Sequence, residues 1–339
     1  MLPEELEEWL TSLGYPKYRA RQVFGWINKQ GAGSVRQMTN LPATLRELLQ
    51  KDFRTGTVEA EQCSKDGSRK LLIRFDDGQR VETVLLPQGT RFTICLSSQA
   101  GCGMGCAFCA TGREGLSRQL SAGEITEQVR LAELKFDKPA SNVVFMGMGE
   151  PLANYENTVR AIKLLNHPWG RNIGIRHLTI STCGLVPQIQ KLSELDWQIV
   201  LAVSLHAATD QLRGKLMPIN SKYPLSKLLP ACREYAARTG RRVTFEYVML
   251  KGVNDGEEQL RALSKLLRGW LCHLNLIPFN PAAGLPYTAC SAREIRQFAL
   301  RLEAQGIAVT VRSSMGADVA AACGQLRGGR VGHEHPGKN

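Results

Sequence analysis

The sequence contains no apolar run long enough to span a bilayer and no long block of lysine or arginine. Residues 1–8 (MLPEELEE) are acidic and lack the basic-then-apolar pattern of a signal peptide. No internal repeat or low-complexity tract interrupts the chain, and only the last ten residues have a disordered composition. These absences predict a globular cytoplasmic protein that is not bound to a membrane.

The composition favours a globular protein with an anionic partner. At 339 residues, with 43% hydrophobic and 22% charged residues, the chain can bury one large domain with one or two small additions. The net charge of +12 favours a polyanionic partner, although a basic protein without such a partner is the alternative on charge alone. In a cytoplasmic protein the ten cysteines are expected to be thiols, metal ligands or catalysts rather than a disulfide framework.

Three of the cysteines, Cys102, Cys106 and Cys109, form a CxxxCxxC pattern among glycines. A structural zinc site would need a fourth ligand, and ferredoxins use other spacings and a fourth cysteine per cluster. Three thiolates can instead hold a 4Fe–4S cluster whose fourth iron has no protein ligand and can chelate a substrate. The pattern therefore predicts radical S-adenosylmethionine (SAM) chemistry; the alternative is a chance grouping of buried free cysteines.

The first 91 residues divide into a helical part and a strand part. Residues 1–54 contain three segments with apolar residues at helical spacing, which predict a small helical domain. Its basic and aromatic side chains suit RNA binding, and its aromatic residues suit a small core equally well. In residues 55–91, two strand-like runs flank Asp77-Gly78, which is a strong signal for a β-hairpin.

From residue 92 onward, apolar strand candidates alternate with helix candidates, and a last helix and a short strand follow. The six strand candidates are 92–96, 142–146, 177–181, 199–205, 243–250 and 273–279. We therefore expect an α/β fold in which residues 92–312 form a partial (β/α)6 radical SAM barrel. The helical domain and the hairpin extend it, and residues 313–339 form a C-terminal loop and tail.

Polar motifs follow these strands, at the barrel end where catalytic groups are expected. In Gly147-Met-Gly-Glu-Pro151 the glycines expose backbone groups, and Glu150 can bind a ligand ammonium such as that of SAM. Each of the other polar residues, taken singly, suits a structural cap, but their shared position at one barrel end favours a common site. The predicted SAM-binding residues are Gly149, Glu150, Ser181, Ser204, Leu205, His206 and Asn280.

Two more cysteines and a glutamate stand out. Cys95 ends the first strand and should face the cluster region. Cys323 follows the last strand among small residues and glycines, which suggests a mobile loop that approaches something closely; a cysteine without a role is the alternative. Glu82 lies on a strand among apolar residues, and alternation alone predicts that it faces solvent. We assign no role to the remaining cysteines, Cys63, Cys183, Cys232, Cys272 and Cys290.

The motifs together resemble the RlmN/Cfr family of radical SAM methyltransferases, over essentially the whole chain. The N-terminal segment 18–26 (YRARQVFGW) is similar to the entry motif of that family. The other segments that carry the resemblance are 95–102 (CLSSQAGC), 102–112 (CGMGCAFCATG), 145–151 (FMGMGEP), 203–207 (VSLHA), 216–220 (LMPIN), 245–248 (FEYV), 252–255 (GVND), 275–278 (NLIP) and 321–326 (AACGQL).

The resemblance implies methylation of carbon 2 of an adenosine in 23S ribosomal RNA, with tRNA as a further candidate substrate. It implies that Cys323 first receives a methyl group from SAM and then, after loss of a hydrogen atom to a 5′-deoxyadenosyl radical, adds to the adenine. It implies that Cys95 removes the ring proton and closes a transient disulfide with Cys323. Glu82, thirteen residues before Cys95, matches the position of the proton acceptor of the family.

The resemblance also implies the cofactors and partners. One 4Fe–4S cluster would be held by Cys102, Cys106 and Cys109, with SAM on its open iron, and flavodoxin or ferredoxin would donate electrons to a monomeric enzyme. The chain departs from the family before Cys323, where residues 312–322 read RSSMGADVAAA. Many relatives have basic residues before Gly316 and an aspartate where Ala320 stands.

Three alternatives stay open at this point. The same machinery could act on carbon 8 of adenine, as in antibiotic-resistance members of the family, although Gly149-Glu-Pro151 favours carbon 2. A cluster-carrying RNA-binding protein or redox sensor would need neither a SAM pocket nor the Cys95 and Cys323 pair. A radical SAM enzyme that acts on protein or a small molecule is disfavoured by the basic charge and the helical extension.

Overall fold

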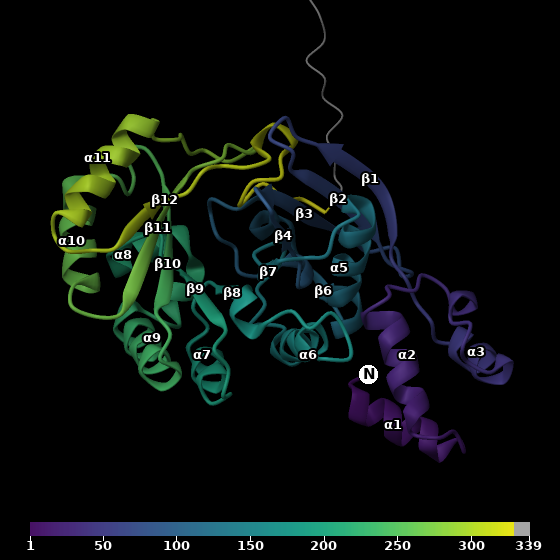
Figure 1. The fold of residues 1–339 in the computed structure, drawn as a ribbon. Helices are drawn as coiled ribbons and strands as arrows, with labels where there is room; N and C mark the ends of the chain where they lie inside the picture. Colours follow the sequence, from purple (N-terminus) through teal and green to yellow (C-terminus); the bar gives the residue numbers. More distant parts are fainter. Residues whose placement is uncertain (329–339) are drawn as a thin grey trace, which may run out of the picture.

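One curved sheet of ten strands organises residues 1–328, the part of the chain that the computed structural model describes (Figure 1). The strand order is β1-β2-β3-β4-β7-β8-β9-β10-β11-β12, and β5 and β6 form a separate pair. The strands are β1 (Thr57–Cys63), β2 (Arg69–Arg74), β3 (Arg80–Gln88), β4 (Arg91–Cys95), β5 (Gln99–Cys102), β6 (Gly115–Gln119), β7 (Asn142–Phe145), β8 (Leu178–Thr182), β9 (Val200–Ser204), β10 (Val243–Met249), β11 (Cys272–Pro278) and β12 (Val309–Val311).

The predicted α/β barrel is confirmed. Strands β4, β7, β8, β9, β10, β11 and β12 run parallel to one another, and the first six of them are the six predicted strands. These strands read as continuous apolar runs because a parallel sheet is covered on both faces. The helices between and after them are α4 (Ala110–Glu114), α5 (Ala122–Phe136), α6 (Tyr155–Asn166), α7 (Val186–Ser193), α8 (Asp210–Leu216), α9 (Leu225–Thr239), α10 (Glu257–Leu267) and α11 (Ala292–Glu303).

The predicted hairpin is present as β2 and β3, and a third strand, β1, pairs with β2. Sequence reasoning missed β1 because nearly every residue in it is exposed, so no apolar alternation marks it. Strand β3 pairs antiparallel with β4, the first barrel strand. The hairpin extension is therefore part of the same continuous sheet as the barrel strands and is not a separate hairpin.

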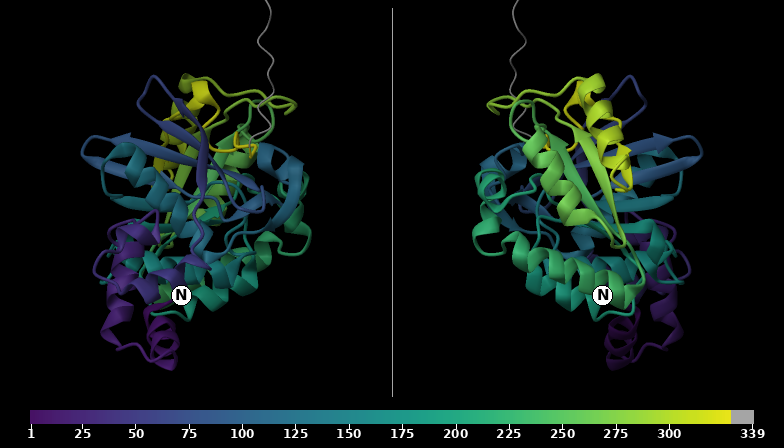
Figure 2. Two further views of the ribbon diagram at one scale, coloured as in Figure 1. Left: turned by 90° about the vertical axis from the view of Figure 1, so that its right-hand side faces the viewer. Right: turned by 90° about the vertical axis from the view of Figure 1, so that its left-hand side faces the viewer.

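The N-terminal helices dock on the outside of the barrel, far from the C-terminal segment (Figures 1 and 2). Arg160 of α6 pairs with Glu5, and the ring of Phe24 meets His167 edge-on at 5.0 Å. Phe24 is buried in this contact, whereas Tyr18 keeps 56% of its surface exposed. The three helices are α1 (Pro3–Ser12), α2 (Tyr18–Asn28) and α3 (Ala43–Gln50), and the 3-10 turns of the described chain are η1 (Val35–Gln37), η2 (Ile175–His177), η3 (Pro218–Ser221) and η4 (Ala317–Val319).

No helix within residues 1–328 has both the length and the apolar character that crossing a membrane would require.

A buried glutamine of α5, Gln128, fixes the strand ends that lead into the site. Its Oε1 accepts the Thr83 hydroxyl of β3 and the backbone N–H of Ser97, both at 2.8 Å, and its Nε2 donates to the Ser97 carbonyl at 2.8 Å. The Ser97 hydroxyl in turn donates to the Glu82 carbonyl at 2.6 Å and accepts the Met148 N–H at 2.9 Å. One amide thus sets the positions of β3, of the segment after β4 and of the turn after β7.

Replacing Gln128 with leucine should lower the free energy of unfolding by at least about 2 kcal/mol, because the buried partners in Thr83 and Ser97 lose their hydrogen bonds. Anaerobic urea titration of the two proteins measures the difference. Gln190→Leu, on the exposed side of α7, is the control and should change stability by no more than about 0.5 kcal/mol. Equal midpoints for the two variants would show that Gln128 is not a structural hub.

Candidate active site

The three cysteines of the CxxxCxxC pattern lie together at the barrel end where the parallel strands finish. Cys102 ends β5, and Cys106 and Cys109 lie in the turn that leads into α4. The turn is tied to the far side of the barrel, because the N–H of Ala107 donates to the carbonyl of Leu216 at 2.9 Å. Gly101 is required there, since its φ is 79° and a Cβ would stand 2.1 Å from the carbonyl oxygen of Gly115.

The electrostatics of the three thiols fit a polynuclear cluster. Burial raises the pKa of Cys102 to about 11, and burial and the neighbouring Cys109 and Cys102 raise that of Cys106. Thiolates grouped in such a place need a positive counter-charge, which iron ions would supply. The pattern offers three thiols and no fourth ligand, a donor set that fits a cluster with an open iron better than a closed zinc site.

The turn after β7 is built around Gly149 and Glu150. Gly149 has a φ of 97°, and a Cβ would lie 2.5 Å from that of Gln99, so only glycine fits. The Glu150 N–H donates to Gln99 Oε1 at 2.7 Å. The buried carboxylate accepts the N–H groups of Leu152 at 3.0 Å and Cys183 at 2.7 Å. Burial raises the Glu150 pKa, an effect that a ligand ammonium would oppose.

The other predicted SAM-binding residues lie at the ends of their strands. Ser181 is in β8 and Ser204 ends β9, and both are partly accessible. Leu205 is fully buried, and its N–H donates to the carbonyl of Glu246 in β10 at 3.0 Å. Asn280 follows β11 and donates to the carbonyl of Pro278 at 3.3 Å. The structure therefore brings the predicted residues to one end of the barrel.

His206 is held in an uncommon backbone conformation, with a φ of 56°. Its Nδ1 accepts the N–H of Val248 at 3.0 Å, so the neutral ring carries its proton on Nε2. Burial and the nearby Arg213 lower the pKa of His206 to about 3. The ring also meets Phe108 of the cysteine turn edge-on at 4.5 Å. His206 is thus a fixed, neutral donor beside the cysteine turn.

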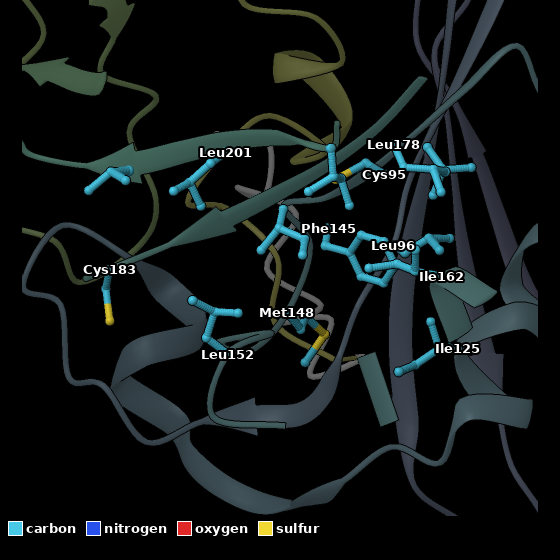
Figure 3. Close-up of a cluster of buried hydrophobic side chains, with 14 of the residues drawn as sticks. Cys95, Leu96, Ile125, Phe145, Met148, Leu152, Ile162, Leu178, Cys183 and Leu201 are labelled. Atoms are coloured by element: carbon cyan, nitrogen blue, oxygen red, sulfur yellow. The ribbon is translucent and has the colours of Figure 1, made fainter. Parts of the chain in front are cut away.

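Cys95 and Cys323 lie in the same region of the barrel end. Cys95 is buried in the hydrophobic core shown in Figure 3, and burial followed by the neighbouring Cys323 raises its pKa. Cys323 keeps accessible surface, yet burial and the Glu246 carboxylate raise its pKa, and Arg312 lowers it. Because Cys323 contributes to the raised pKa of Cys95, the two thiols lie in one neighbourhood of the barrel end.

The segment that carries Cys323 is held on both sides. On one side the donors come from α4. The Ala110 N–H donates to the Gly324 carbonyl at 2.8 Å, and the Thr111 hydroxyl donates to the Leu326 carbonyl at 2.7 Å. On the other side Asp66, in the turn between β1 and β2, accepts the Gly316 N–H at 2.7 Å. The segment predicted as a loop thus has a defined place between the cysteine turn and the hairpin extension.

Glu82 does not face solvent, so the interpretation from strand alternation was wrong. It is 5% exposed, it pairs with Lys70 at 3.0 Å, and it accepts the N–H of Arg327 at 2.6 Å. Lys70 also donates to the carbonyl of Ala320 at 3.1 Å. The C-terminal segment covers this face of β3, while α5 covers the other, so both faces are buried. Register places Glu82, Lys70 and Cys95 on the same face of the sheet.

Sequence reasoning missed three residues that line this region. Cys183 follows β8 and donates its N–H to Glu150; burial and Glu150 raise its pKa well above the usual value. Glu246 is buried on β10 and accepts from Asn275 at 2.9 Å. Arg213 of α8 is fully buried. Only Cys183 carried a positional signal, because it follows the end of β8, where the other motifs lie. Glu246 stands in the middle of β10.

Comparison with known proteins agrees with this architecture. The model of the radical SAM superfamily matches residues 96–263, and that of the "Ribosomal RNA large subunit methyltransferase N-terminal domain" matches residues 1–54. A crystal structure titled as a radical SAM methyltransferase from Sphaerobacter thermophilus is similar, with a TM-score of 0.94 and 48% identity over 97% of this chain and 98% of that one.

Two curated relatives extend the match. The probable dual-specificity RNA methyltransferase RlmN of Symbiobacterium thermophilum is 46% identical over 99% of this chain and 92% of its own length. The dual-specificity RNA methyltransferase RlmN of Anaeromyxobacter dehalogenans is 48% identical over 96% of this chain and 90% of its own. Fold and site define a radical SAM enzyme. Within that class, the chain belongs to the RlmN family of methyltransferases.

Replacing Glu82 with glutamine should loosen the C-terminal segment, because it leaves the Lys70 ammonium buried without a counter-charge. Hydrogen exchange of residues 320–328 should speed up at least tenfold. The double variant Lys70→Met/Glu82→Gln removes the orphan charge while the glutamine oxygen can still accept from Arg327, so it should recover most of the protection. Unchanged exchange in Glu82→Gln would contradict the docking role.

Proposed function

We propose that this chain methylates carbon 2 of an adenosine in 23S ribosomal RNA, with tRNA as a second substrate. The observation that carries the proposal is the pair of neighbouring thiols, Cys95 and Cys323, with the Cys323 segment bound to the helix that follows the three-cysteine turn. Relatives named as dual-specificity RNA methyltransferases support RNA as the substrate class. The presence of Gly149-Glu150-Pro151 favours carbon 2 over carbon 8.

The chemistry calls for a radical because carbon 2 of adenine is electron-poor and does not attack a methyl cation equivalent. Cys102, Cys106 and Cys109 would hold a 4Fe–4S cluster, and Gly149, Glu150, Ser181, Ser204, Leu205, His206 and Asn280 would hold SAM. When bound, these groups would supply one electron from a flavodoxin or ferredoxin, a 5′-deoxyadenosyl radical, and an acceptor for the electron that the RNA adduct later releases. The protein must place its own sulfur atoms around that radical.

Cys323 provides the carbon that is transferred. Its sulfur loses a proton and takes a methyl group from one SAM, forming S-methylcysteine. The methyl group then gives up a hydrogen atom, and the resulting thiomethylene radical adds to carbon 2. The contacts that hold residues 324–326 against α4 would keep this sulfur beside the cysteine turn while the RNA is joined to it.

Cys95 resolves the adduct. After the adduct loses one electron, Cys95 removes the proton from carbon 2. Its sulfur then gives up that proton and bonds to the Cys323 sulfur while the sulfur–methylene bond breaks, and the methylene carbon takes up one proton. The products are methylated RNA and a Cys95–Cys323 disulfide, which a reductant must open before the next cycle. We assign Glu82, on the same sheet face as Cys95, as a proton acceptor in this sequence.

The N-terminal helices and the net charge suit the RNA. Tyr18 is exposed, and the guanidinium of Arg19 lies 4.9 Å from its ring centre. An exposed aromatic ring with a cation beside it can stack on an unpaired base and contact its phosphate. Phosphate neutralisation makes binding strongly salt-dependent.

Nucleoside mass spectrometry tests the proposal. Anaerobically reconstituted enzyme, SAM and reductant are given ribosomal RNA from cells that lack the modification, and 2-methyladenosine is expected. 8-Methyladenosine would move the activity to the other ring carbon. Turnover of SAM without either product would refute an adenosine substrate in this RNA and direct the assay to tRNA and then to protein.

The two cysteines should fail in different ways. Cys95→Ala should accumulate a covalent protein–RNA adduct, visible as a shifted band that nuclease removes, because nothing resolves the thioether. Cys323→Ala should still cleave SAM slowly but should transfer no methyl group. Cys63→Ala, at an exposed site on β1, is the matched control and should behave as the unchanged enzyme. Normal yields of methylated RNA from either of the first two variants would overturn the assigned roles.

A further inference from the structure

Arg213 is a buried arginine without a carboxylate partner. It lies in α8 and has no exposed surface. Its Nη1 donates to Asn220 Oδ1 at 2.9 Å, and its Nη2 donates to the carbonyls of Cys183 at 2.7 Å and Ser204 at 3.1 Å. Its Nε has no hydrogen-bond partner within the described residues, and no ion pair there includes its guanidinium. All of its protein partners are neutral oxygens.

A cation in such a place is costly unless a negative charge faces it. Burial lowers the pKa of Arg213, and the groups that oppose this are Cys183 first and then Cys106, Asp210 and Cys232. Asp210, in the first turn of the same helix, already accepts the Leu225 N–H at 2.8 Å. The negative charge that balances Arg213 is therefore expected on the side of the cysteine turn.

The helix that carries Arg213 is in direct contact with that turn. The last residue of α8, Leu216, accepts the N–H of Ala107, and a Cβ added at Gly105 would lie 3.6 Å from Cγ of Pro218 in η3. Through the Cys183 peptide, Arg213 is also linked to Glu150, which accepts the N–H of the same residue. The guanidinium thus lies behind the ends of β8 and β9, on the protein side of the cysteine turn.

We propose that Arg213 is the fixed counter-charge of the cluster held by Cys102, Cys106 and Cys109, and that it raises the reduction potential of that cluster. Three thiolates on a 4Fe–4S core carry a net charge of about −1, and reduction by one electron makes it about −2. A buried cation stabilises the second state more than the first, because the attraction grows with charge in a medium of low dielectric constant. This role rests on the proposed function, in that it assumes the cluster.

Redox titration monitored by electron paramagnetic resonance tests the proposal on reconstituted full-length enzyme, without SAM or RNA. Arg213→Met removes the charge and keeps most of the side-chain volume. It should lower the equilibrium constant for cluster reduction at least tenfold, which is about 59 mV for one electron. Arg213→Lys keeps the charge and should stay within threefold of the unchanged enzyme.

Asn220 offers a second route that leaves Arg213 in place. Asn220→Asp sets a carboxylate oxygen where Oδ1 already accepts from the guanidinium, so it should neutralise the charge and lower the equilibrium constant in the same direction. Asn220→Ala is the matched control: like Asn220→Asp it loses the donation from Nδ2 to the Asp210 carbonyl, but it adds no charge. Its potential should stay close to that of the unchanged enzyme.

The outcomes distinguish failure of the Arg213 proposal from failure of the proposed function. Absence of iron, sulfide and a cluster signal in the unchanged enzyme would refute the proposed function itself. If the cluster in Arg213→Met and Asn220→Asp has the same reduction potential as in the unchanged enzyme, only the role of Arg213 is refuted. Equal shifts in reduction potential in Arg213→Met and Arg213→Lys would also refute that role. If both charge-removing variants lose the cluster while Arg213→Lys and Asn220→Ala retain it, the counter-charge is supported; loss from Arg213→Lys as well would overturn it.

Discussion

The buried ion pair between Lys70 and Glu82 is the interaction on which the rest of the site depends. It stands on the sheet face that also carries Cys95, and both of its members bind the backbone of the C-terminal segment, Lys70 at Ala320 and Glu82 at Arg327. A barrel alone would hold that segment on one side only, through contacts such as those with α4. Because β3 continues the barrel sheet through β4, the ion pair joins the last described residues to the region of Cys95 in the first barrel strand.

The barrel end brings together several thiols of raised pKa. Burial is the largest cause of the raised pKa for Cys95, Cys102, Cys106 and Cys183. Such thiols stay protonated and unreactive until a metal centre or a reaction partner changes their surroundings. This property suits a radical enzyme, whose sulfur atoms must act in sequence and not react with one another at rest.

Local patterns predicted most of the fold. The parallel strands are apolar because both sheet faces are covered, and their helices have clear spacing and caps, such as Ser121 with Glu124 at the start of α5. Strand β1 was not predicted because its side chains are mostly exposed and show no apolar alternation. The prediction that Glu82 faces solvent was wrong because alternation assumes a sheet with one solvent-exposed face. Here a segment more than two hundred residues later in the chain covers the face that carries Glu82.

The sequence by itself determined the cysteine turn, the strand-end motifs and the positions of most helices and strands, because these follow from spacing over a few residues. Only the tertiary structure decided that Glu82 pairs with Lys70 and that Arg213 is buried behind the cysteine turn without a carboxylate. Those facts arise from contacts between segments far apart in the chain. No local periodicity encodes them, since burial and charge partners are properties of the packed molecule.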